Sequence, residues 1–269
     1  MLPIDKRYTV LVGNYGSGKT ELAIAIARMQ RAQTPQGRVA LVDLDIVNPY
    51  FRSAEQHALL EAEGIEVFMP SFAMSTVDIP ALPAQIQAVF EQPYAHVVID
   101  VGGDDTGATA LGRYAPYTHA LRNEMNVLYV VNPCRPFSSS VEDIIGLYRL
   151  IERQARLRPD HLVNNANLQE HTTPEVLLAG QALLMQAAAQ LDRPVSMIAG
   201  RAPLKEALPD ALKPLFFAFE PIMKPDWLVD SECALRCRPP LCPACARSWE
   251  KRRTPTSPQW RCPVCAACA

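Results

Sequence analysis

The segment Gly13-Asn14-Tyr15-Gly16-Ser17-Gly18-Lys19-Thr20 has the form G-x-x-x-x-G-K-[ST], and the rest of the chain is best interpreted from it. An apolar, β-rich run at 8–12 precedes this segment, and a helical pattern at 21–29 follows it. A strand, a glycine-rich loop and a helix in this order aim a row of backbone N–H groups at a polyphosphate. The sequence therefore predicts a phosphate-binding loop. In it Lys19 reaches the β- and γ-phosphates and Thr20 offers its hydroxyl to Mg²⁺.

Outward from this loop, apolar runs alternate with helical patterns as far as about residue 200. The runs lie at 38–43, 65–69, 96–100, 127–131, 161–164 and 194–198, and the helical patterns at 49–63, 82–91, 138–157 and 174–191. Most runs are apolar at consecutive positions, which is typical of strands covered on both faces. We therefore expect an α/β fold with a mostly parallel sheet flanked by helices on both faces.

Ligands of such sheets bind beyond the carboxyl ends of the strands, which directs attention to the polar residues there. Asp100 ends the apolar run 97–99 and is followed by Val101, Gly102 and Gly103. An acid at the tip of a buried strand beside a phosphate loop commonly supports Mg²⁺. We expect this role for Asp100, and we expect Gly103 to bring a backbone N–H near the γ-phosphate. A carboxylate that only caps the next turn is the alternative.

A second acidic pair, Asp43 and Asp45, lies at the end of the run 38–43. One of the two could orient the attacking water while the other holds Mg²⁺ or its water shell. The structural alternative is a solvated loop in which Asn48 caps the next helix. Asp104 and Asp105, after the Asp100 strand, are interpreted as solvated loop residues.

Composition describes an ordinary globular chain: 269 residues, 49% hydrophobic and 20% charged, with a net charge of −2. This charge gives no indication of nucleic-acid binding. No apolar run approaches the roughly 18–20 residues that span a bilayer. Residues 1–7 lead directly into the first strand without a secretory pattern, so a cytoplasmic location is expected.

The cysteines are concentrated at one end of the chain. There are eight, and only Cys134 lies in the first 232 residues. Segment 231–269 also carries seven Arg or Lys against two Glu, and it is rich in proline. In a reducing compartment such a cluster suggests metal binding rather than disulfides. We therefore expect a nucleotide-binding domain at 1–230 and a cysteine-rich module at 231–269.

Four of these cysteines have the spacing of a zinc ribbon. The pattern C-x₂-C-x₁₆-C-x₂-C is formed by Cys242, Cys245, Cys262 and Cys265, and four thiolates suit tetrahedral Zn²⁺. Cys233, Cys237 and Cys268 remain outside this set. Cys237-x₄-Cys242-x₂-Cys245 followed by Cys262 loosely matches plant-type iron–sulfur spacing, so an iron–sulfur cluster stays open, as does a redox-active or disordered tail.

At this point the chain resembles the MinD/ParA/CobQ-type (SIMIBI class) P-loop ATPases over about residues 8–200. The resemblance rests on segments 13–20, 43–46 (DLDI), 98–103 (VIDVGG) and 131–141 (VNPCRPFSSSV), and it extends to 162–165 (LVNN). It implies ATP, Mg²⁺, nucleotide-dependent dimerisation and slow hydrolysis. In that scheme Asp45 positions the water, Asp100 supports Mg²⁺, and Asn164 contacts the purine base.

The chain departs from this family in its loop. Many members carry an early lysine that reaches the partner subunit's phosphates, whereas this chain has Asn14 and Tyr15 at the equivalent positions. The loop is also similar to those of the GTP-dependent nickel-enzyme maturation factors UreG and HypB. Segment 164–167 (NNAN) lacks the aspartate of Asn-Lys-x-Asp that pairs with guanine, which favours ATP over GTP.

These observations predict a Mg²⁺-dependent ATPase that acts as a nucleotide switch, as a homodimer with an unidentified protein client, in cofactor or metal-cluster maturation. The alternatives are a non-catalytic nucleotide-sensing adaptor, a GTP-dependent metallochaperone and an iron–sulfur carrier; membrane or nucleic-acid partners are not expected. The predicted catalytic residues are Lys19, Asp45 and Asp43. The predicted nucleotide contacts are Gly13, Asn14, Tyr15, Gly16, Ser17, Gly18, Lys19, Thr20, Glu21, Asp100, Gly103 and Asn164, with Thr20 and Asp100 at Mg²⁺.

Overall fold

A computed structural model of the chain describes residues 2–45, 54–69, 84–103, 105–222, 250–252 and 259–261. The chain divides into two compact units, Met1–Pro221 and Ile222–Ala269. The boundary predicted between 230 and 231 lies outside the described residues.

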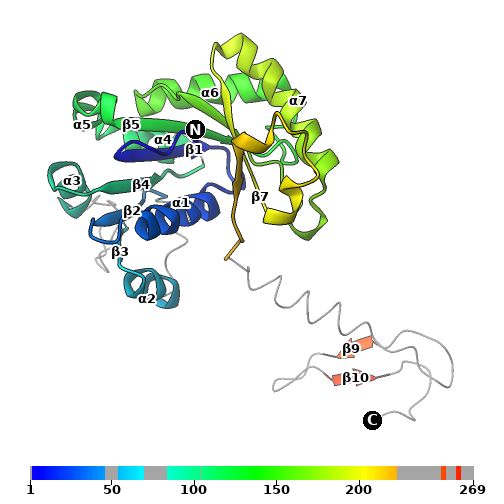
Figure 1. Ribbon diagram of the computed structural model, residues 1–269, viewed down its shortest axis with the longest axis horizontal. Coiled ribbons are helices and arrows are strands. Elements are labelled where there is room, and N and C mark those ends of the chain that lie inside the picture. Colours follow the sequence, from blue (N-terminus) through cyan, green and yellow to red (C-terminus); the bar gives the residue numbers. More distant parts are fainter. Residues whose placement is uncertain are drawn as a thin grey trace. The chain divides into compact units, whose positions relative to one another are not determined.

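The first unit is built on an eight-stranded sheet in which all neighbouring strands run parallel (Figure 1). The strand order is β3-β2-β4-β1-β5-β6-β7-β8, so the strand that enters the glycine loop is central and pairs directly with β4 and β5. The strands are β1 (Tyr8–Gly13), β2 (Val39–Asp43), β3 (Ile65–Phe68), β4 (His96–Asp100), β5 (Met125–Val131), β6 (His161–Asn164), β7 (Val195–Gly200) and β8 (Phe216–Ala218). The predicted α/β fold with a parallel sheet is therefore confirmed.

Helices cover both faces of this sheet, with α1 on one face and α4, α6 and α7 on the other (Figure 1). The helices are α1 (Lys19–Gln33), α2 (Ala54–Ala62), α3 (Ala84–Glu91), α4 (Asp105–Gly112), α5 (Ala115–Ala120), α6 (Val141–Ala155) and α7 (Pro174–Leu191). The helix predicted at 138–157 begins only at Val141, because Ser140 Oγ accepts a hydrogen bond from Asp143 N at 3.1 Å and so caps it. Residues 46–53, which include Asn48 and the start of the helix predicted at 49–63, lie outside the described residues.

The strands β8, β9 (Glu250–Arg252) and β10 (Gln259–Arg261) and the helices α4 and α5 were not anticipated from the sequence. The prediction that Asp105 is a loop residue is wrong, because it begins α4. The segment is short and contains glycine and threonine, so its helical pattern is weak. Its helical structure is stabilised by burying Ala108 and Leu111 in the core.

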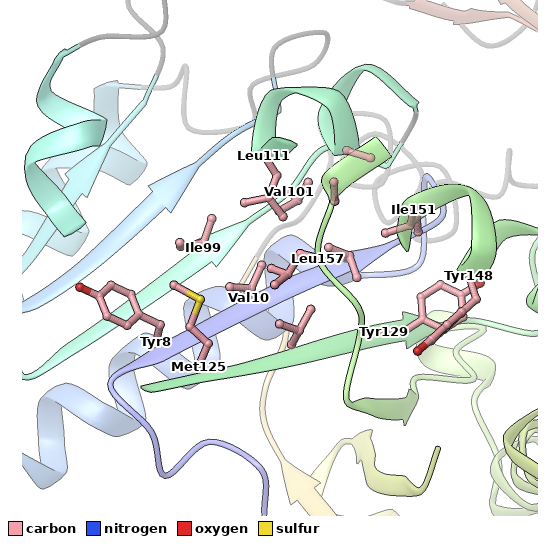
Figure 2. Close-up of a cluster of buried hydrophobic side chains, with 14 of the residues drawn as sticks. Tyr8, Val10, Ile99, Val101, Leu111, Met125, Tyr129, Tyr148, Ile151 and Leu157 are labelled. Atoms are coloured by element: carbon pink, nitrogen blue, oxygen red, sulfur yellow. The ribbon is translucent and has the colours of Figure 1, made fainter. Parts of the chain in front are cut away.

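Alternation along each central strand explains why the runs are apolar throughout. In β1, Tyr8, Val10 and Val12 join the large core cluster beneath α4 and α6, part of which is drawn in Figure 2, whereas Leu11 is buried outside that cluster. In β4, Ile99 belongs to the same core cluster, whereas Val98 is buried outside it. Because successive strand side chains point to opposite faces and both faces are covered, every position of β1 is buried, as is every position of β4 after His96.

The second unit contributes a short antiparallel ladder to the described residues. Strand β9 (Glu250–Arg252) pairs with β10 (Gln259–Arg261), with Lys251 opposite Trp260. In the sequence this ladder lies between the two cysteine pairs 242/245 and 262/265, which are outside the described residues, as are Cys233, Cys237 and Cys268. Across the described part of the chain, no helix has the length and apolarity needed to cross a bilayer.

Candidate functional site: the phosphate loop and the carboxyl edge of the sheet

The glycine loop connects the end of β1 to the start of α1, and its backbone angles need glycine. Gly16 has φ 70° and Gly18 has φ 84°, in the left-handed region that other residues rarely adopt. Space is also tight, because a Cβ on Gly18 would lie 2.3 Å from Asn165 Nδ2. The loop therefore wraps closely and delivers the first N–H groups of α1 to its concave side.

The central contact of the site joins the helix to the sheet. Thr20 Oγ1, in the first turn of α1, donates a hydrogen bond to Asp100 Oδ2 at 2.6 Å. The alternation of side chains along β4 explains why Asp100 contacts Thr20. In β4 the alternating residues Val97 and Ile99 belong to the core beneath α4 and α6, so Asp100 points to the face covered by α1.

Lys19 and Asp100 lie in the same buried environment. Both are almost fully buried, and Lys19 Nζ donates to the carbonyl of Asn14 at 2.8 Å. Burial raises the pKa of the Asp100 carboxyl above its ordinary value, and the positive charge of Lys19 opposes this shift. The Lys19 ammonium is therefore held inside the loop, where a phosphate would lie.

The oxygen atoms at this point suit a magnesium ion. Asp100 Oδ1 is buried and has no hydrogen-bond partner among the described residues, although Oδ2 is bound to Thr20. A hydroxyl and a carboxylate with a spare oxygen are hard ligands of the kind that Mg²⁺ takes in combination with water and phosphate oxygens. The residues present therefore fit the ion predicted for them.

Asp43 and Asp45 lie beside this pair. Asp43 is the register partner of Asp100 across β2 and β4, and it is almost fully buried. Its Oδ1 accepts the Asp45 N–H at 2.8 Å, which turns the chain at the strand end. A Cβ on Gly102 would lie 3.3 Å from Asp45 Cγ, so the Asp45 side chain lies beside the glycines that follow β4.

Gly103 lies against the phosphate loop itself. A Cβ at this position would meet Tyr15 N and Cα at 2.5 Å and the Asn14 carbonyl carbon at 2.9 Å. The two backbones can therefore approach only because residue 103 is glycine. This places the segment after β4 against the start of the loop, and the predicted approach of the Gly103 N–H to the γ-phosphate stays a prediction. Of the other predicted contacts, Ser17 is buried and Glu21 lies in the first turn of α1.

Asn164, predicted to contact the purine base, is fully buried. Its Nδ2 donates to Leu177 O at 2.9 Å and to Gln181 Oε1 at 3.2 Å, and its Oδ1 accepts the Ala166 N–H at 3.0 Å. Both amide hydrogens are therefore taken inside the protein. A contact with a base would require these bonds to be exchanged, so the base contact stays a prediction.

Asn165, the next residue, is the one that reaches the phosphate loop, and no role was predicted for it. Its Nδ2 donates to Ser17 O at 2.6 Å, and Asn165 is nearly fully buried. Its backbone N–H donates to the carbonyl of Val131, the last residue of β5, so the start of the loop after β6 is held against β5. In the sequence, the only indication of a role for Asn165 is its place at the end of an apolar run, and this does not identify its hydrogen-bond partner.

Beyond the ends of β6 and β7 the described residues enclose a small pocket of about 140 Å³. Its lining includes Gly200 at the end of β7 and residues after β6 and β7, among them Asn167, Glu170, Thr172, Arg201 and Leu204. The Asn165–Ser17 hydrogen bond connects the first of these loops to the phosphate loop. The pocket therefore lies on the same edge of the sheet as the phosphate loop.

The cysteine site cannot be placed, since its four predicted ligands lie outside the described residues. In the part that the structure does describe, no group of three or more His, Cys, Asp or Glu side chains is arranged to hold a metal ion. Cys134, in the loop after β5, is an exposed free thiol.

A parallel sheet whose central strand ends in a glycine loop, followed by a helix that carries Lys19 and Thr20, with an aspartate at the tip of the adjacent strand, defines the P-loop NTPase fold.

Comparison with known proteins adds a likeness in fold. No family profile matches the chain, and no curated protein sequence matches it. Among solved structures, FlhF complexed with GTP and Mg²⁺ aligns at 16% identity and a TM-score of 0.45, covering 73% of this chain and 66% of that one. Chloroplast FtsY from Physcomitrella patens aligns at 15% identity and a TM-score of 0.48, covering 72% of this chain and 58% of that one. The signal recognition particle 54 kDa protein from Aeropyrum pernix K1, in complex with GDP, aligns at 19% identity and a TM-score of 0.46. This alignment covers 72% of this chain and 41% of that one.

In each case the matched part is less than two thirds of the other chain. At such identities the similarity concerns the fold alone.

Proposed function

We propose that this chain is a Mg²⁺-dependent P-loop nucleoside triphosphatase of the SIMIBI class, that its nucleotide is ATP, and that it acts as a nucleotide switch. The observation that carries the proposal is the Thr20–Asp100 hydrogen bond of 2.6 Å beside the buried Lys19. A buried carboxylate with a spare oxygen, a hydroxyl and an ammonium at one glycine loop form a site for a metal-bound polyphosphate.

Each residue then has a defined task. The N–H groups at the start of α1 and the Lys19 ammonium bind the β- and γ-phosphates and neutralise the charge that develops during hydrolysis. Thr20 and Asp100 would hold Mg²⁺, and the bound ion would supply positive charge to the phosphates. Asp45 orients the attacking water, and its position beside Gly102 supports this role. Asp43 holds the Asp45 backbone and so acts as a positioning residue.

We assign the base to the pocket beyond β6 and β7. The loop after β6 reads Asn164-Asn165-Ala166-Asn167, and it offers amides where guanine recognition needs a carboxylate. The acid among the described lining residues of this pocket is Glu170, whose side chain is exposed. This favours ATP, and tighter binding of GTP would assign the recognition of guanine to Glu170.

Calorimetry with ATP and GTP, each with Mg²⁺ and with EDTA, tests the proposal. The wild-type protein should bind ATP more tightly, and Lys19→Ala should weaken binding at least 100-fold, since a buried charge-assisted contact to phosphate is lost. Lys6→Ala is the matched control, because Lys6 donates to Met125 O at the opposite end of the sheet. If neither nucleotide binds to the wild type, the proposal fails.

A second experiment separates an enzyme from an adaptor. Asp45→Asn keeps the size of the side chain but removes the charge that orients water, so turnover should fall about 100-fold or more while ATP affinity stays within a few fold. Loss of biological function together with turnover supports the ATPase. If function persists without turnover, the chain is a nucleotide-sensing adaptor.

We also propose that segment 231–269 is a zinc-ribbon-like module with Cys242, Cys245, Cys262 and Cys265 as ligands, and that a homodimer presents it to a metalloenzyme client. The β9–β10 ladder between the two cysteine pairs supports the module, because zinc ribbons hold metal between such short elements. One zinc per chain in a colourless, anaerobically purified sample is the expected result. A brown sample with iron and sulfide would favour the iron–sulfur alternative.

A further inference from the structure

The segment 132–140, between β5 and α6, is fastened to the phosphate loop by the side chain of Asn14. Asn14 Nδ2 donates to Pro136 O at 3.0 Å and lies 3.0 Å from Ser138 Oγ. The Oδ1 of Asn14 accepts the Tyr15 N–H at 2.8 Å, so the amide orientation is set from within the loop. The two loops are therefore joined at a defined point.

Within this segment the backbone turns twice around Arg135. The Arg135 N–H donates to Asn132 O at 3.0 Å, and Arg135 O accepts the Ser138 N–H at 3.3 Å. Asn132 is itself fixed, because its Oδ1 accepts the N–H of Cys134 and its Nδ2 donates to Asn167 O. The position of the Arg135 backbone relative to the phosphate loop is thus set by hydrogen bonds on both sides.

The Arg135 side chain extends over the phosphate loop at Gly16. A Cβ built on Gly16 would lie 3.6 Å from Arg135 Nε, 3.8 Å from Cδ and 4.0 Å from Cζ. Gly16 has no side chain, so the guanidinium lies next to bare backbone there. An arginine in this place adds a second positive charge beside Lys19 to the loop.

In the part of the chain that the structure describes, this guanidinium has no anionic partner. Throughout the described ranges, no carboxylate lies within ion-pair distance of Arg135, and its side chain makes no hydrogen bond. Arg28, Arg38, Arg122 and Arg158, in contrast, each pair with Glu or Asp. Arg135 is therefore available to an anion that comes from outside.

A second polar group, without a partner in the described part of the chain, lies in the phosphate loop. Ser17 Oγ is buried and lacks a hydrogen-bond partner among the described residues, and it lies in the loop between Gly16 and Gly18. A buried hydroxyl without a partner is unfavourable unless a ligand supplies one. A guanidinium fork together with a hydroxyl donor matches the oxygen atoms of a phosphate chain.

We propose that Arg135 binds the phosphate chain of the nucleotide held by its own subunit, so that this arginine after β5 complements Lys19 in the loop. The inference rests on the proposed function, because it assigns one more ligand to the same nucleotide. It identifies the ligand class as nucleoside di- and triphosphates, and it requires no residue from another subunit.

The experiment compares wild type, Arg135→Ala, Arg135→Lys and Arg149→Ala by calorimetry with ATP and ADP at two salt concentrations. Arg149 is an exposed arginine on α6, so Arg149→Ala removes the same charge away from the loop. Arg135→Ala should weaken ATP binding about tenfold or more, as expected for a lost charge-assisted hydrogen bond. Arg135→Lys should restore part of the affinity, because lysine keeps the charge but lacks the planar fork.

Salt supplies a readout that a purely structural role would not change. Affinity of the wild type should fall more steeply with ionic strength than affinity of Arg135→Ala, because one charge has been removed from the contact. Urea unfolding should give the same stability for both proteins, since the Arg135 side chain makes no intramolecular hydrogen bond in the described structure.

Three outcomes are decisive. A tenfold loss in Arg135→Ala with an unchanged Arg149→Ala supports the assignment. Equal losses in both variants, or an affinity of Arg135→Ala within twofold of a wild type that binds ATP, overturn it and leave the proposed function intact. A wild type that binds no nucleotide overturns both.

Discussion

Asn165 shows how a single buried amide can organise the site without touching a ligand. It donates to Ser17 O at 2.6 Å and connects two segments that are 148 residues apart in the chain. We expect Asn165→Ala to lower the free energy of unfolding by about 1–2 kcal/mol. Nucleotide affinity should fall about five- to tenfold as the loop loosens.

The matched control for this prediction is Asn126→Ala. Asn126 is also nearly buried and donates to Asp5 Oδ1 at 2.9 Å, at the amino end of β5. It should lose comparable stability with no effect on nucleotide affinity measured by calorimetry. Equal affinities of the two variants would contradict the role given to Asn165.

Two glycines offer a second test at the residue scale. A Cβ on Gly103 would lie 2.5 Å from Tyr15 N, so Gly103→Ala should displace the phosphate loop and reduce nucleotide affinity at least tenfold. Gly146, within α6, has nothing within 4 Å of its Cβ position. Gly146→Ala should therefore stabilise the protein by about 0.5–1 kcal/mol through helix propensity, with unchanged affinity. Urea unfolding and calorimetry measure both effects, and a Gly103→Ala variant that binds like wild type would refute the close contact.

At the scale of elements, three side chains link the edge strand β3 to the segments that precede β2 and β4. Arg38 Nε and Nη2 donate to the two oxygens of Glu66 at 2.8 Å each, and Tyr94 OH donates to Glu66 Oε2 at 2.7 Å. The hydrogen bonds from Arg38 lower the pKa of the Glu66 carboxyl despite an opposing effect of burial. The ionised form of Glu66 is thus the stabilising one.

The sign of the pH dependence follows from this shift. Because the pKa of Glu66 is lower in the folded state, its stabilisation is fully present above the unfolded value of 4.5 and is lost as pH falls through the folded value. Glu66→Gln should therefore be slightly less stable than wild type at neutral pH, and the difference should shrink below pH 4.5. The effect is small, since solvent screens this partly exposed group. Urea unfolding across this pH range measures it, and a difference that grows toward acid pH would contradict it.

At the scale of the whole molecule, the unit Met1–Pro221 contains the complete parallel sheet and the large core cluster. A fragment 1–222 should therefore unfold cooperatively and bind nucleotide within about threefold of the full chain. The fragment lacks the cysteine-rich segment. A chelator should therefore affect its nucleotide binding only by removing Mg²⁺. A fragment that fails to fold would show that the second unit contributes to the stability of the first.

Local patterns predicted much of this protein, and particular residues show where they stopped. Strand and helix periods and the spacing of 13–20 indicated the phosphate loop, the parallel sheet and the importance of Asp100, since these features involve residues close in sequence. The elements α4, α5 and β8 escaped because they are short and depend on burial of a few side chains rather than on a strong period. The sequence placed Asn164 and Asn165 at the edge of the sheet where ligands bind. It could not show that the Asn164 amide donates to α7 whereas the Asn165 amide donates to the phosphate loop.

The chain alone thus predicted which residues could bind a metal-bound polyphosphate, because that chemistry depends on residue type and short spacing. Partners far apart in sequence came from folding: Thr20 with Asp100, Asn165 with Ser17, and Arg135 with Gly16. Such pairs depend on strand order and on which face each residue points to, and both are set by packing of the entire sheet between its helices.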